Sequence, residues 1–250
     1  SVMYANNEVG TIQPIKEIVE VVKSVNRYRK ENNNNLPLYL HTDACQATSH
    51  LDIHVSRLGI DLMTINGGKV YGPKQTGALY VKAGISLEPY VAGGGQERGL
   101  RSGTENFLGI LGFGEAMNEV KNLTKICNSE IKNNRDLLET NLKKLSNEIK
   151  IFGEDTNRLG NTCYFAYPSM TSENQVIALD QKGICVSSGA ACSSGKVEPS
   201  HVLKAMKVDD KYIHSAIRVS LGWESTKEQV ETFFNVWKSD CFKNGALNVR

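Results

Sequence analysis

A lysine and an aspartate that follow short apolar runs are the first candidates for chemistry in this chain. Lys69 comes after the run Leu62 to Ile65 and a Gly-Gly pair, and Gly72-Pro73 then reverses the chain. Asp43 comes after the run Leu38 to Leu40. Burial lowers the pKa of a lysine and makes it a nucleophile that can form a Schiff base with a carbonyl compound. The alternative is a surface lysine on a glycine turn. The turn alone favours the surface interpretation.

A thiol and a guanidinium further along the chain could act together with Lys69. Cys192 lies in the small-residue run SSGAACSSG, which favours an accessible, reactive thiol. Cys185 lies inside an apolar run and is expected to be its structural counterpart. Arg218 stands between two apolar residues of a predicted strand, where an unpaired charge is costly to bury. Its planar fork suits the carboxylate of an amino acid.

The elements expected in the first half would bring such residues to one edge of a sheet. An amphipathic helix is predicted from Pro14 to about Asn32, and a short helix at Val55 to Leu58. The expected strands are 2–4, 38–40, 62–65 and 77–81. Strands that alternate with helices form a parallel sheet, and its ligands bind beyond the carboxyl ends of the strands. Asn7, Asp43 and Lys69 all fall at or soon after such ends.

The second half has a different pattern. From Glu105 to Leu145 the sequence reads as helical and becomes richer in Lys, Asn and Glu, which predicts a domain boundary near residue 115. Residues 1–115 and 116–250 are therefore expected to form two domains. Strands are predicted at 149–152, 162–166, 185–187 and 216–219. The last helix is expected to begin with a capping box of Ser225 and Glu228 and to turn an apolar stripe into the core.

Composition places the chain among ordinary globular proteins. It has 250 residues, of which 40% are hydrophobic and 22% charged, and a net charge of +2. This balance gives no warrant for nucleic-acid or membrane binding. The six cysteines form no CxxC pair, which predicts reduced thiols and a cytoplasmic location. The chain opens at Ser1 in what reads as the middle of an α/β domain, so we expect a longer protein whose N-terminal part is absent.

Four motifs in order give the chain a specific resemblance. They are HTDACQA, TINGGKVYGPKQTG, GGGQERGLRSGTEN and VSSGAACSSG, flanked by NNEVG at Asn6 and IRVSLG at Ile217. With these motifs the chain resembles the cysteine desulfurases of the nitrogen-fixation and iron-sulfur-cluster type, in the class V aminotransferase family. The resemblance covers nearly all residues. It implies an α/β protein of the PLP-dependent transferase fold type I, with the mainly parallel sheet of the large domain (incomplete) and a smaller α+β C-terminal domain.

The resemblance implies that the cofactor is pyridoxal 5′-phosphate. Lys69 matches the lysine that holds it, Asp43 the partner of the ring nitrogen, and Gln46 the partner of the ring hydroxyl. Asn7 matches a second group at that edge of the ring.

The phosphate site departs from the family pattern. Asn66 and Gly68 occupy the places of a serine and a histidine, so that contacts would come from the Asn66 amide and the Gly68 backbone. Thr104 matches a threonine that reaches the phosphate of the partner subunit, which implies a homodimer. None of the five histidines matches the family's ring-stacking histidine. We therefore expect the chain alone to bind the cofactor weakly and to turn over cysteine poorly.

The implied reaction converts L-cysteine to L-alanine. Arg218, with Asn7 beside it, would bind the substrate, and Lys69 would move the α-proton. Cys192 would take the sulfur as a persulfide and pass it to an iron-sulfur scaffold or another acceptor protein. No metal is expected, apart from Cys192 as a transient iron-sulfur ligand. The alternatives are a selenocysteine lyase, another class V relative, or a non-catalytic paralogue or fragment that acts as a binding subunit.

Overall fold

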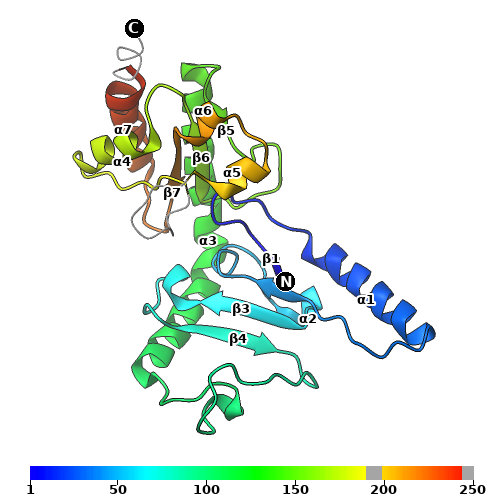
Figure 1. Ribbon diagram of the computed structural model, residues 1–250. Helices are drawn as coiled ribbons and strands as arrows, with labels where there is room; N and C mark the ends of the chain where they lie inside the picture. Colours follow the sequence, from blue (N-terminus) through cyan, green and yellow to red (C-terminus); the bar gives the residue numbers. More distant parts are fainter. Residues whose placement is uncertain (190–198, 244–250) are drawn as a thin grey trace. The chain divides into compact units, whose positions relative to one another are not determined.

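The computed structural model describes residues 1–189 and 199–243, except the side chains of residues 123–127. The chain divides into two compact units (Figure 1). Unit 1 comprises residues 1–5 and 13–124, and unit 2 comprises residues 6–12 and 125–250. The division at residue 124 falls within the long helix α3 (Phe107–Leu145), which also contains the predicted boundary near residue 115. That residues 1–115 and 116–250 are separate domains stays a prediction.

Unit 1 is built on a four-stranded sheet in the order β1-β2-β3-β4 (Figure 1). The strands are β1 (Val2–Met3), β2 (His41–Asp43), β3 (Leu62–Asn66) and β4 (Gly77–Val81). The first three strands are parallel, and β4 is antiparallel to β3. The expected mainly parallel sheet is confirmed.

The predicted strand at 38–40 lies too early in the sequence. The backbone N–H and C=O of Leu38 bond the side chain of Asn26, at 2.8 Å each, and the N–H of Leu40 donates to Asp61 Oδ2 at 2.9 Å. These groups are thus engaged by side chains, and the ladder begins at His41. As a result Asp43 is the last residue of its strand.

The helices of unit 1 follow their sequence signals closely. Helix α1 (Ile15–Glu31) begins after Pro14 and buries Ile15 and Val19. Helix α2 (Val55–Leu58) ends at Gly59, whose left-handed φ of 76° suits glycine. Two 3₁₀ turns, η1 (Gly67–Lys69) and η2 (Glu97–Gly99), complete the unit.

Unit 2 has an antiparallel sheet in the order β5-β6-β7. Its strands are β5 (Lys150–Ile151), β6 (Thr162–Ala166) and β7 (Ala216–Ser220). Its helices, besides the second part of α3, are α4 (Ser172–Asp180), α5 (His201–Ala205), α6 (Asp210–Ile213), α7 (Lys227–Trp237) and the π-helical η3 (Lys238–Lys243). None of the described helices is long and apolar enough to cross a membrane.

The two faces of the β6 strand belong to different clusters. Cys163 and Phe165 join the core with Leu138, Leu179 and Trp237 from α3, α4 and α7. The alternate residues of β6 face the other way. They pack in a second cluster, which includes Val9, Phe152, Tyr164, Leu203 and Tyr212. Segment 6–12 therefore contributes to the core of unit 2 through Val9.

Two expectations for unit 2 are wrong. Residues 185–187 form no strand; Ser187 makes a single bridge to Arg218. The capping box of α7 is Thr226 with Gln229, one residue later than expected, because the Ser225 hydroxyl accepts the N–H of Gly222 instead. The apolar stripe of this helix packs into the core, as predicted, because Val230, Phe233 and Trp237 are all buried.

Candidate active site

Asp43 and Lys69 lie at the same edge of the unit 1 sheet. Asp43 ends β2, directly opposite Thr64 of the parallel strand β3. Lys69 ends the turn η1, three residues after β3. Burial, then the hydrogen bond and charge of Asp43, raise the pKa of Cys45, and the nearby charge of Lys69 partly opposes this rise. Cys45 donates its backbone N–H to Asp43 Oδ1 at 2.9 Å. A primary amine and a carboxylate thus share the carboxyl edge of the parallel strands.

The turn that carries Lys69 is tightly built. The Gly67 N–H donates to Thr76 O at 2.9 Å, and its C=O accepts the N–H groups of Val70 and Gly72. A Cβ on Gly67 would overlap Thr76 Oγ1, so only glycine fits there. Lys69 itself is exposed, as the glycine turn favoured.

The remaining candidates of unit 1 lie in the turn after β2, at the end of β3 and in the segment before α3. Gln46 is half-buried in the turn that follows Asp43, and Thr104 is exposed in the segment before α3. Asn66 ends β3, and its Oδ1 accepts the Gly68 N–H at 2.8 Å. The Gly68 N–H, expected to be available for a phosphate, is thus already engaged. The Asn66 amide nitrogen is the group of this pair that remains for a phosphate oxygen.

Unit 2 brings Asn7 and Arg218 together. Arg218 lies in the middle of β7, and its Nη1 donates to the backbone O of Asn7 at 2.7 Å. Its Nε is buried and has no hydrogen-bond partner among the described residues. An unpaired guanidinium N–H inside a protein is unfavourable and suits an incoming anion. Cys192 lies outside the described residues.

Sequence reasoning missed a buried polar cluster around Glu8. Glu8 is only 1% exposed and Ser200 only 2%. Ser200 Oγ donates to Glu8 Oε2 at 2.5 Å. The Tyr164 hydroxyl is buried there without a hydrogen-bond partner among the described residues. Burial, followed by the charge of Glu8, raises the pKa of Tyr164. The acidic residue in the motif NNEVG was the available signal.

The cysteines differ from expectation in one case. Cys185 is exposed, so it is not a buried structural thiol. Its apolar neighbours belong to an irregular segment rather than to a strand. Cys163 is fully buried, and burial followed by the Glu139 charge raises its pKa well above the ordinary value. Among the described residues, no group of histidine, cysteine and acidic side chains could hold a metal ion.

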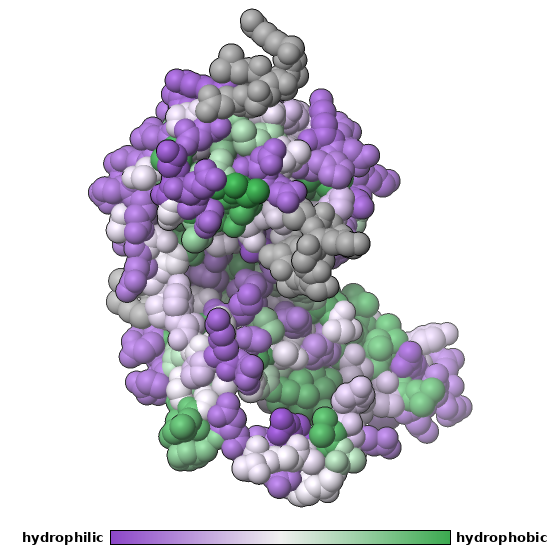
Figure 2. Space-filling view, turned by 60° about the vertical axis from the view of Figure 1, so that its left-hand side comes forward, coloured by the Kyte–Doolittle hydropathy of each residue, from purple (hydrophilic) through white to green (hydrophobic). Residues whose placement is uncertain are grey.

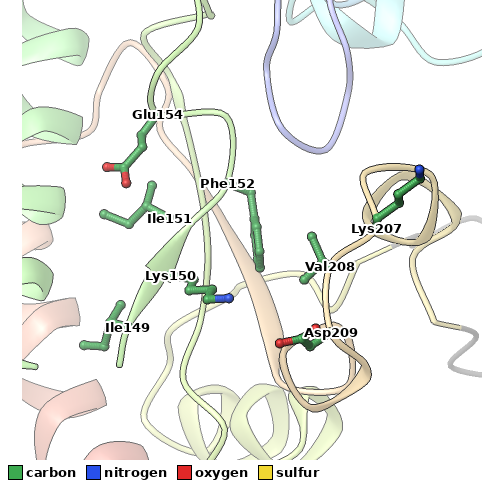
Figure 3. Close-up of a pocket in the computed structure, with 8 residues that line it drawn as sticks. All are labelled: Ile149, Lys150, Ile151, Phe152, Glu154, Lys207, Val208 and Asp209. Carbon is green, nitrogen blue, oxygen red and sulfur yellow. The ribbon is translucent and has the colours of Figure 1, made fainter. Parts of the chain in front are cut away.

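A hollow of about 330 Å³ lies in unit 2 beside the Glu8 cluster (Figure 3). Its eight lining residues are Ile149, Lys150, Ile151, Phe152, Glu154, Lys207, Val208 and Asp209. None of them is a predicted site residue. The ring of Phe152 also packs edge-on against Tyr164, with 5.4 Å between ring centroids.

The fold and these residues define a class V aminotransferase. The family model for aminotransferase class-V matches residues 1–233, and the chain belongs to that family. Similar curated proteins are the cysteine desulfurases IscS of Methanosarcina thermophila and Dictyoglomus turgidum. The first is 41% identical and matches over 94% of this chain and 55% of its own length. The second is 37% identical and matches over 94% of this chain and 57% of its own length. The chain thus spans a little over half the length of these relatives.

Solved structures agree on the fold. The NifS-like protein from Rickettsia africae superposes with a TM-score of 0.83 at 33% identity, over 94% of this chain and 59% of that one. Another NifS-like protein has a TM-score of 0.78, also at 33% identity, over 93% of this chain and 58% of that one. The expected α/β fold of the PLP-dependent transferase fold type I is confirmed by these similarities.

Proposed function

We propose that this chain is part of a pyridoxal 5′-phosphate-dependent cysteine desulfurase that converts L-cysteine to L-alanine. The observation that carries the proposal is the placement of Asp43 and Lys69 on one sheet edge. The names of the similar curated proteins support the choice of reaction within the family.

The donor set of unit 1 fits this cofactor. Lys69 offers an accessible amine for covalent attachment, and Asp43 a carboxylate for the ring nitrogen. Gln46 would bond the ring hydroxyl. The Asn66 amide would bond the phosphate, and Thr104 would reach the phosphate in the partner subunit. When bound, the cofactor withdraws electrons from the substrate's α-carbon, which makes the α-proton acidic.

The other proposed roles concern the substrate. Arg218 would bind its carboxylate through the unpaired Nε edge, held in place by the backbone of Asn7. Lys69 would take the α-proton. The Cys192 thiolate would attack the substrate sulfur, so that an S–S bond forms while the C–S bond breaks and its electron pair passes to the carbon. Protonation of that carbon completes L-alanine and leaves a persulfide on Cys192.

The partners proposed are a second copy of the chain and a sulfur acceptor, either an iron-sulfur scaffold or another protein, in the cytoplasm. Exposed apolar side chains at the start of α3 support the homodimer. Phe107, Leu108 and Leu111 are 67%, 79% and 56% exposed. Figure 2 shows hydrophobic patches of this kind, in green, within a largely hydrophilic surface.

The test is to measure alanine formed from L-cysteine by the cofactor-loaded protein, with sulfide released under a thiol reductant. We expect the two products in equal amounts. Cys192→Ser should abolish sulfide release and keep the cofactor absorbance, because this thiol acts after the cofactor has bound. Cys185→Ser is the matched control and should keep activity. Absence of alanine, or full turnover by Cys192→Ser, would contradict the proposal.

A further inference from the structure

The carboxylate of Glu8 has no part in the reaction proposed above, yet it is buried next to the residues that would bind the substrate. Burying a carboxylate is expensive unless hydrogen bonds compensate it. Glu8 receives one such bond, from Ser200, and its Oε1 has no partner among the described residues. Its neighbour Val9, at 3% exposed, fixes the same segment in the core. A buried carboxylate with a single hydrogen bond is unfavourable for stability, which suggests that Glu8 serves the function of the protein.

The contacts of its side chain tie segment 6–12 to the start of α5. Ser200 Oγ donates to Glu8 and also accepts the Leu203 N–H at 3.0 Å, which caps that helix. Gly189 lies against the same serine: a Cβ there would stand 3.5 Å from Ser200 Cβ and 3.1 Å from Tyr164 Oη. Glu8 thus bonds a rigid, closely packed point of unit 2.

The contacts of its backbone reach the arginine. The peptide group between Asn7 and Glu8 is fixed on both sides: its N–H donates to Asn6 Oδ1 at 2.8 Å, and its C=O accepts from Arg218 Nη1 at 2.7 Å. The orientation of this peptide therefore sets the direction of the guanidinium. The Glu8 side chain, anchored at Ser200, prevents the peptide from rotating.

We propose that Glu8 is a positioning residue for substrate binding. Its bond to Ser200 holds the Asn7–Glu8 peptide so that Arg218 is anchored through Nη1 and keeps its Nε edge for the carboxylate of an amino acid. The inference rests on the proposed function for the role of Arg218. Glu8 itself contacts neither substrate nor cofactor.

The test measures binding at Arg218 without using turnover. Phenylglyoxal modifies accessible arginines, and peptide mass mapping reports the rate at Arg218. L-Alanine, which carries the same carboxylate as the substrate, should slow this rate in the cofactor-loaded protein. In Glu8→Ala, half-protection should need about tenfold more L-alanine, the loss typical of a hydrogen bond to a charged group. Glu8→Gln keeps the acceptor for Ser200 and should restore most of the protection.

Two further variants separate positioning from general destabilisation. Ser200→Ala removes the donor to Glu8 together with a helix cap, so it should also weaken protection. Thr226→Ala removes the cap of α7 in the same unit without touching Glu8, and should lower the melting temperature but leave protection unchanged.

The outcomes distinguish this inference from the proposed function. If Glu8→Ala folds and needs no more L-alanine than the unaltered protein, the positioning role is wrong, whatever the activity. If Thr226→Ala weakens protection as much as Ser200→Ala does, the role is again wrong, because stability alone explains the loss. If the protein makes no alanine from cysteine but protection still depends on Glu8, the desulfurase proposal fails and the positioning role stands.

Discussion

At the scale of single residues, Lys69 is an exposed amine on a glycine turn, as the turn alone favoured. In the proposed site, its reactivity toward the cofactor would come from geometry, with Asp43 and Asn66 holding the ring and phosphate within reach of the turn. Covalent catalysis by lysine requires such positioning as well as an unprotonated amine.

Borohydride reduction of the cofactor-loaded protein should fix the cofactor on Lys69. Peptide mass mapping would find the adduct there, and Lys69→Ala should lose it. Two nearby lysines are internal controls: Lys82 pairs with Asp61 at 3.1 Å, and Lys74 follows Pro73 in the next turn. An adduct on either of them would show that a lysine other than Lys69 holds the cofactor.

The thiols of Cys45 and Cys241 should resist alkylation at ordinary pH. Burial, then the hydrogen bond and charge of Asp43, raise the pKa of Cys45 to about 12. Burial and the Asp240 charge raise the pKa of Cys241 to about 11. Only the thiolate reacts, so at pH 8 roughly one Cys241 in a thousand is reactive at any moment. Of Cys45, Cys185 and Cys241, iodoacetamide should label exposed Cys185 first, and mass spectrometry after a short pulse would show it.

The same raised pKa values have a consequence for stability. The folded state favours the protonated thiols. Their contribution to the free energy of unfolding is therefore complete below the ordinary thiol pKa and is lost as the pH rises through the pKa values of the folded protein. The melting temperature should therefore fall between about pH 9 and pH 11. Cys241→Ala should show a smaller fall over that range. An equal fall in the variant would mean that other groups control alkaline unfolding.

At the scale of elements, the turn η1 is the most sensitive to a single methyl group. A Cβ on Gly67 would overlap Thr76 Oγ1 and lie 3.1 Å from Phe113 Cδ2, whereas a Cβ on Gly68 meets only Asn66 Oδ1, at 3.2 Å. Gly67→Ala should therefore cost about 2 kcal/mol in the free energy of unfolding and displace Lys69. Gly68→Ala is the matched control and should cost about 0.5 kcal/mol or less. Chemical denaturation would compare them, and equal losses would contradict the packing argument.

Most elements could be predicted because their signals are local. Helix α1, helix α2, strand β3 and strand β6 each have an apolar pattern and end signals within their own residues. Strand β2 was misplaced because Asn26, twelve residues earlier, engages the backbone of Leu38. The capping box of α7 shifted because Ser225 bonds Gly222 instead. Such side-chain competition cannot be seen in a local pattern.

Sequence motifs predicted which residues form the candidate site, but not how exposed each of them is. The placement of Asp43 and Lys69 on one sheet edge follows from two strand ends, and the sequence shows both. The exposure of Cys185 does not follow, because it depends on how the irregular segment around it projects from the sheet. The bond between Glu8 and Ser200 joins residues 192 positions apart, and neither residue has a sequence pattern that indicates the other.

At the scale of the whole molecule, the chain passes between the two units three times. Segment 6–12 belongs to unit 2, although residues on both sides of it belong to unit 1. Its backbone pairs with the segment around Arg158: Ile12 N–H donates to Asn157 O, and Leu159 N–H donates to Gly10 O, both at 2.9 Å. Arg158 in turn is bound to Glu139 of α3 through two hydrogen bonds of 2.6 and 2.7 Å. The segment that carries Asn7 and Glu8 should therefore be only as stable as unit 2.

Breaking this ion pair should loosen segment 6–12 without loosening the sheet of unit 1. Arg158 and Glu139 are only 6% and 10% exposed. Arg158→Ala leaves the buried Glu139 carboxylate with only its longer contact to Arg135, at 3.6 Å, and should cost about 3 kcal/mol. Hydrogen exchange would show faster exchange at Gly10, Ile12 and the β6–β7 amides, with Met63 of β3 unchanged. The matched control is Lys132→Ala, whose pair with Asp136 is solvent-exposed, and it should change exchange little. Equal acceleration at Met63 would instead mean that the two units unfold as one, and that the Asn7–Glu8 peptide depends on the whole molecule.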